Sequence, residues 1–152
     1  FCLHNSHYTP RQIQNYISRI SGPLLDRIDI HVEVPNVQYK DPASDSTCEL
    51  SEETREKVTE ARNIQLKRFQ GLKYSTNSRM SAKQIKQHCS LDSRAEGLLH
   101  QAMTELNISA RGYNKILKVG RTIADIDHCR DVHQEHISEA AQYRNLDRDL
   151  WK

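Results

Sequence analysis

The sequence predicts a mainly α-helical protein in which one short helix and one strand precede a helical domain. The strand is expected from Ile28 to Val34, where apolar and polar residues alternate without a break. The helical domain is expected from Ser51 onward, because apolar residues there recur at helical spacing. No other segment can pair with the strand, so we expect the tail of an α/β domain followed by a complete helical domain. The alternative is a small helical protein whose strand pairs within an oligomer.

The first part of the chain, residues 1–35, is expected to hold this helix and this strand. The helix runs from Pro10 to Ile20, with Thr9 as its N-cap and proline at the first helical position. Pro35 ends the strand, because proline has no N–H to donate to a ladder. Residues 36–50 contain polar and turn-forming side chains and are expected to be a linker.

Residues 51–152 are expected to form the helical domain. Its first helix begins at Ser51 and runs to about Phe69, with glutamates in the first turn and basic residues in the last, as the helix dipole favours. Gly71 ends this helix. Further helices are expected over Ser81–Cys89 (with a Ser81–Gln84 capping box), Asp92–Leu106, Ser109–Asp127 and Asp131–Tyr143.

The composition indicates a globular protein rather than a strongly basic nucleic-acid binder. Of 152 residues, 36% are hydrophobic and 28% are charged, and the net charge is only +2. The four cysteines lie far apart in no short motif, so we expect them to be reduced in a cytoplasmic chain. No apolar run reaches the length of a membrane span, and we expect no membrane partner.

Three stretches of the sequence carry a resemblance to a known family. The stretches SGPLLDRIDIHVEVP, ISARGYNKILKVGRTIADID and HISEAAQYRNLDR closely resemble the C-terminal part of the ComM/YifB family. These are bacterial Mg-chelatase-like AAA+ ATPases associated with natural competence. The resemblance implies that residues 1–35 end the AAA+ α/β core, with the arginine-finger region and the last strand. It implies that residues 51–152 form the helical lid domain of the Mg-chelatase C-terminal type.

The resemblance also implies an activity for the full-length protein. It would be a ring-forming ATPase, a hexamer, that binds ATP and Mg²⁺ and drives DNA branch migration as a helicase in natural transformation. DNA would be held by upstream regions. The sequence contains no G-x-x-x-x-G-K-[ST] loop, so we expect this chain alone to be a fragment that does not hydrolyse ATP. The alternatives are an ATP-dependent protein-remodelling subunit of the metal-chelatase type and a helical interaction module.

Two arginines match functional residues of the family. Arg27 matches the arginine finger, which stabilises the charge on a transferring phosphoryl group held by the neighbouring subunit. Arg111 matches the sensor-2 arginine, which contacts ATP bound to its own subunit. Its expected place in the first helical turn, where the dipole disfavours a cation, also makes it a candidate. Without the resemblance, Arg27 reads as an ion-paired turn arginine and Arg111 as a solvated surface arginine.

Other polar clusters give weaker indications. Cys2 and His4 stand where family members often carry Cys-x-Cys, and in the full-length protein they would bind Zn²⁺ together with upstream cysteines. In this chain alone we expect a solvated end without metal. The pair His133 and His136 is expected to lie on the surface, and Lys118 and Arg121 are expected to be surface or interdomain charges.

Overall fold

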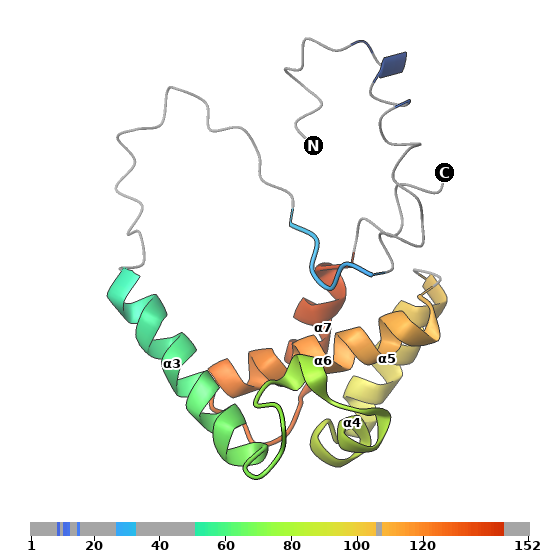
Figure 1. Cartoon of the computed structure of the whole chain (residues 1–152). Coiled ribbons are helices and arrows are strands. Elements are labelled where there is room, and N and C mark those ends of the chain that lie inside the picture. The colour runs from blue at the N-terminus through green and yellow to red at the C-terminus, as the bar shows by residue number, and fades with distance from the viewer. Residues whose placement is uncertain are drawn as a thin grey trace.

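The chain is mainly α-helical in the computed structural model (Figure 1). The structure describes Thr9, Arg11, Gln12, Asn15 and the ranges 27–32, 51–105 and 108–144. Apart from the helical positions Arg11, Gln12 and Asn15, these residues form five α-helices and one short 3₁₀ helix, and they contain no strand. The elements are α3 (Ser51–Arg68), η2 (Asn77–Arg79), α4 (Ala82–His88), α5 (Ser93–Glu105), α6 (Ala110–Ile126) and α7 (Gln134–Gln142).

Most helix ends lie where local sequence signals predict them. At the start of α4, the side chain of Gln84 accepts a hydrogen bond from the Ser81 N–H at 2.9 Å, which confirms the capping box. At the start of α5, the Asp92 carboxylate accepts from the Ala95 N–H at 2.7 Å. Gly71, just after α3, has a φ of 84°, a conformation that glycine adopts without strain. The cap at Thr9 is also confirmed, because its hydroxyl accepts from the Gln12 N–H at 3.4 Å, and its own N–H donates to the Gln12 side chain at 2.8 Å.

The start of α7 differs from the prediction. Its N-cap is His133 rather than Asp131, and the His133 N–H donates to Nδ1 of His136 at 2.9 Å. Histidine is an unusual partner in such a reciprocal cap, so its sequence signal is weak. The prediction that both histidines lie on the surface is wrong for His136, which is only 4% exposed and has Nε2 3.3 Å from Asp127.

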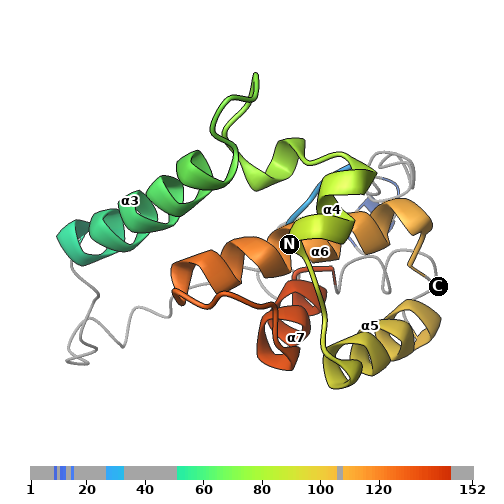
Figure 2. The same cartoon turned by 90° about the horizontal axis from the view of Figure 1, so that it is seen from below.

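Helix α6 is the centre of the domain. It packs against α7, α3, α4 and η2, while α5 packs against α7. Figure 2 shows α3 near one end of α6, and α4 and α5 toward its other end. Gly120 permits the close approach of α6 and α7, because a Cβ atom there would lie 3.0 Å from Cδ1 of Ile137. The hydrophobic core includes Leu99, Ile116, Leu117, Ala124, Val132 and Ile137.

A buried polar cluster joins α3 and η2 to α6. The Asp125 carboxylate accepts hydrogen bonds from Arg68 at 2.5 and 2.6 Å, from Asn77 at 2.8 Å and from Arg121 at 3.1 Å. Arg121 also donates to the carbonyls of Cys129 and Arg130. The prediction of a surface or interdomain charge at Arg121 is therefore wrong: the residue is 2% exposed, and its partners lie within the helical domain. Its partners come from distant segments, which sequence spacing does not reveal.

Residues 28–32, the part of the predicted strand that the structure describes, do not form a strand. Residues 28–32 are not paired in any ladder, although the His31 N–H donates to the Tyr143 carbonyl at 2.8 Å. Ile28, Ile30 and Val32 are 40%, 47% and 65% exposed. A strand needs a neighbour to pair with, and the described residues offer none. The linker 36–50 and most of the predicted helix 10–20 lie outside the described residues, although Arg11, Gln12 and Asn15 are helical.

Candidate functional site

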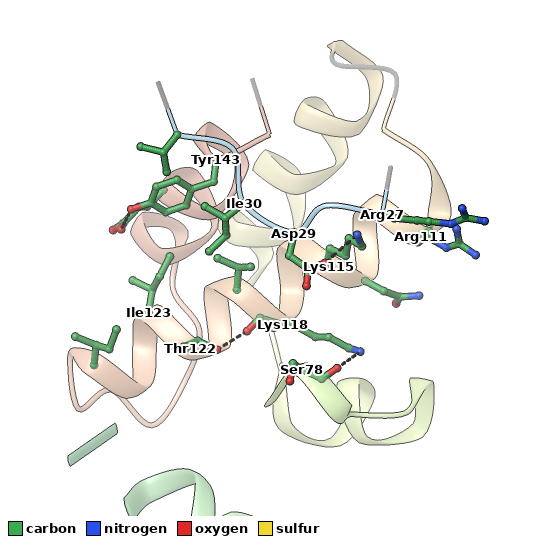
Figure 3. A pocket seen from close by; sticks show the side chains of 15 residues that line it. Arg27, Asp29, Ile30, Ser78, Arg111, Lys115, Lys118, Thr122, Ile123 and Tyr143 are labelled. Atoms are coloured by element: carbon green, nitrogen blue, oxygen red, sulfur yellow. Dashed lines mark hydrogen bonds and ion pairs between the residues drawn. The ribbon is translucent and has the colours of Figure 1, made fainter. Parts of the chain in front are cut away.

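A cavity of about 960 Å³ lies between the segment 27–32, α6 and α7 (Figure 3). Its lining brings together residues that are more than 80 positions apart in the sequence. From the segment come Arg27, Asp29, Ile30 and Val32, from η2 comes Ser78, and from α7 and the turn after it come Glu139 and Tyr143. The α6 residues that line it are Arg111, Asn114, Lys115, Lys118, Val119, Thr122, Ile123 and Ile126.

The face of α6 that lines this cavity changes character along the helix. The first turns present the cations Arg111, Lys115 and Lys118, and the last turns present apolar side chains, among them Ile123 and Ile126. Residues three and four apart share one helix face, so this order produces a cavity with a cationic end and an apolar end. Such a lining suits a ligand that carries both an anionic group and an apolar group.

Arg111 lies at the start of the cationic end. Ser109 caps α6 by accepting a hydrogen bond from the Gly112 N–H at 3.0 Å, and Ala110 is the first helical residue. Arg111 is therefore in the first turn, as predicted, and it is exposed. The free N–H groups of a helix start already favour an anion, and a guanidinium there adds to that preference.

Arg27 lines the same cavity from the other wall. It is exposed and lies in a turn, as the sequence predicts. Figure 3 shows its side chain extending in the same direction as that of Arg111. The segment that carries Arg27 is attached to α6 by an ion pair of 2.8 Å between Asp29 and Lys115. The two arginines singled out from the sequence, 84 positions apart, thus lie on one cavity.

The opposite end of the cavity holds a polar contact between α7 and the turn that follows it. The Tyr143 hydroxyl donates to the Glu139 carboxylate at 2.9 Å. This hydrogen bond raises the pKa of Tyr143 above its usual value, because it stabilises the protonated phenol. The Glu139 carboxylate gives this end of the cavity a negative charge, opposite in sign to the cationic end.

Sequence reasoning missed the role of Lys115, and it expected Lys118 to be a surface or interdomain charge. Lys115 has a side chain that is only 14% exposed, and Lys118 donates to the Ser78 carbonyl at 2.8 Å. A usable signal was present: Arg111, Lys115 and Lys118 follow one another at spacings of four and three, which places them on one helical face.

The possible zinc ligands Cys2 and His4 lie outside the described residues. Within the ranges that the structure does describe, no group of three or more His, Cys, Asp or Glu side chains is arranged to hold a metal ion. In that same part of the chain, no helix is both long enough and apolar enough to cross a bilayer.

Comparison with known proteins gives consistent matches along the chain. The family described as "Magnesium chelatase, subunit ChlI C-terminal" matches residues 48–144, and the family described as "Magnesium chelatase, subunit ChlI" matches residues 3–42. The chain is 38% identical to the competence protein ComM of Haemophilus influenzae over 96% of its own length. It is 36% identical to the uncharacterized protein YifB of Escherichia coli over 93% of its length.

The chain spans only 30% of the length of this ComM protein and 28% of that of YifB. The C-terminal family alone covers most of the chain, including every helix from α3 to α7. The chain therefore belongs to the magnesium-chelatase ChlI family, in which it corresponds to the C-terminal region of ComM- and YifB-like proteins.

Proposed function

We propose that this chain is the C-terminal part of an AAA+ ATPase and that it brings two arginines to bound ATP. The observation that carries the proposal is that Arg27 and Arg111 line the same cavity, with Lys115 and Lys118 beside them. Two guanidinium groups at one end of a cavity suit the oxygens of phosphate groups, whereas Lys115 is already paired with Asp29 and Lys118 with the Ser78 carbonyl. The full-length protein would supply the phosphate-binding loop and the Mg²⁺ ligands from its other regions.

The chemistry of the two arginines follows from their charge. During phosphoryl transfer, negative charge spreads over the phosphoryl oxygens, and a guanidinium placed there stabilises the transition state. We propose that Arg27 acts in this way on ATP held by the neighbouring subunit of a ring, a hexamer. Arg111 would act as sensor 2 on the ATP of its own subunit, where its place at the start of α6 links nucleotide binding to movement of the helical domain. Bound ATP supplies the energy of the cycle.

The work that hydrolysis drives is proposed to be branch migration of DNA during natural transformation. The support is the similarity to a protein named for competence. A second candidate is ATP-dependent remodelling of a protein partner, which the magnesium-chelatase family membership favours. Migration of a four-way DNA junction by the full-length protein, dependent on ATP, supports the first candidate. ATP hydrolysis that is unaffected by junction DNA supports the second.

Mixing variants of the full-length protein tests the roles of the two arginines. Arg27→Ala alone should lower turnover by about a thousandfold, as loss of an arginine finger does. When this variant is mixed with one disabled in the phosphate loop, some interfaces pair an intact loop with an intact finger, so activity should return in part. Full activity of Arg27→Ala alone would overturn the proposed function.

The same mixing experiment with Arg111→Ala assigns the second arginine. In this mixture, one chain has an intact phosphate loop without Arg111, and the other has Arg111 without an intact loop. If Arg111 contacts the ATP of its own subunit, no single chain carries both parts, so activity should not return. Because both arginines line one cavity, the competing arrangement is that both reach the ATP of the neighbour. Equal recovery from both mixtures would establish that arrangement and overturn the division of roles.

A further inference from the structure

The carbonyl oxygen of Ile28, next to Arg27 in the chain, is held by two cations from different parts of the fold. Lys115 of α6 donates to it from Nζ at 3.2 Å. Arg144, in the turn after α7, donates to it from Nη1 at 2.5 Å. Lys115 also forms the ion pair with Asp29 at 2.8 Å, so its ammonium group contacts two successive residues of the segment.

The burial of the two cations makes these contacts stronger than ordinary surface interactions. Arg144 is 2% exposed and the Lys115 side chain is 14% exposed, whereas the Asp29 side chain is 60% exposed. An exposed ion pair contributes little by itself. Hydrogen bonds from ionised donors are stronger than neutral ones, and partial exclusion of water increases their strength further. The contacts to the Ile28 carbonyl therefore anchor the segment, together with the hydrogen bond from the His31 N–H to the Tyr143 carbonyl.

The same lysine lies one helical turn after Arg111. The two residues are four apart on α6 and both line the cavity, so they move together with the helix. A shift of α6 that carries Arg111 toward a ligand also carries Lys115. Through the carbonyl of Ile28 and the carboxylate of Asp29, that shift reaches the residues directly after Arg27.

We infer that Lys115 and Arg144 are positioning residues that clamp the Ile28 carbonyl and so fix Arg27 relative to Arg111. The inference rests on the proposed function of the two arginines, and it adds the device that couples them. Neither clamp residue needs to touch ATP. By this device, the nucleotide bound at Arg111 sets the position of Arg27 relative to the ATP site of the neighbouring subunit.

The first arm of the test measures the clamp itself on the present chain, without nucleotide. Lys115→Met removes both contacts of the lysine, so amide exchange of residues 28–32 should accelerate, including the His31 N–H that donates to Tyr143. Protection of α6 should stay unchanged. Lys115→Arg, which keeps a cationic donor, should exchange like the wild type, and Lys86→Met on the exposed surface of α4 is the matched control. Unchanged exchange at residues 28–32 in Lys115→Met would overturn the clamp.

The second arm measures turnover in the full-length protein. Lys115→Met should lower kcat for ATP hydrolysis by about tenfold to a hundredfold, because misplacement of a positioned group by about 1 Å has that effect. The KM for ATP should change little and Lys115→Arg should restore turnover. Wild-type kcat in Lys115→Met, together with an inactive Arg27→Ala, would overturn the coupling. Full activity of Arg27→Ala would instead overturn the proposed function, and the clamp would stand on the exchange data.

Discussion

Replacing Asp125 by asparagine tests the buried polar cluster on which the packing of α3 against α6 depends. Asp125 is 0% exposed, and each of its two oxygens accepts a hydrogen bond from Arg68. One oxygen also accepts from Asn77 and the other from Arg121. Asparagine keeps the shape of the side chain but turns one oxygen into an NH₂ group. In either orientation that group faces N–H donors, and both guanidinium groups lose their counter-charge.

The expected effect is large because Asp125 and Arg121 are both buried, so the loss of the carboxylate leaves a buried guanidinium without its counter-charge. Removing one partner of a buried ion pair costs about 3–5 kcal/mol. A whole domain is stabilised by only about 5–15 kcal/mol. The C-terminal family match covers residues 48–144, a length for which each kcal/mol lowers Tm by roughly 4–8 °C. Asp125→Asn should therefore lower Tm by on the order of 15 °C or more.

Thermal unfolding followed by circular dichroism at 222 nm measures this loss. Asp131→Asn, an exposed position in the loop before α7, is the matched control and should change Tm by less than about 3 °C. A urea titration of both variants would separate a change of midpoint from a change of slope. A fall in Tm for Asp125→Asn no larger than that of the control would refute the claim that Asp125 neutralises the buried guanidinium of Arg121 and the partly buried one of Arg68.

Three further predictions concern individual residues of the helical domain. Burial raises the pKa of the Cys89 thiol to about 11, so iodoacetamide at pH 8 should alkylate Cys89 far more slowly in the folded chain than in urea, and equal rates would contradict its burial. Burial, followed by the charges of two nearby arginines, lowers the pKa of His88. The free energy of unfolding should therefore be full above about pH 6.5 and decline as the pH falls below that value. The urea midpoint of His88→Gln should decline less over the same pH range. Gly120→Val should cost about 1–3 kcal/mol by forcing the new side chain against Ile137, whereas Gly97→Val, at a position with open space, should cost less in the same denaturation assay.

The sequence by itself determined the family and most of the helix boundaries. The caps at Ser81, Asp92 and Ser109 were predictable because a cap depends on residues only two or three positions away. The left-handed residue after α6 carried no such signal: His128, with a φ of 55°, stands where glycine is usual. The places of Arg27 in a turn and Arg111 in a first helical turn were likewise predictable from adjacent residues.

Only the tertiary structure decided which polar residues are buried and which meet. Arg121 and His136 were expected on the surface. Arg121 is buried because it joins the Asp125 cluster, whose members come from distant segments. His136 is buried against the His133 N–H and Asp127, contacts that depend on the direction of its side chain. The alternation after Arg27 predicts a strand, but pairing is a non-local event, and the described residues contain no neighbour to complete it. The clamp on the Ile28 carbonyl joins positions 87 and 116 residues away. Local sequence patterns specify the secondary structure that a segment prefers. Which residues segment 27–32 contacts is determined by the packing of α6 and α7.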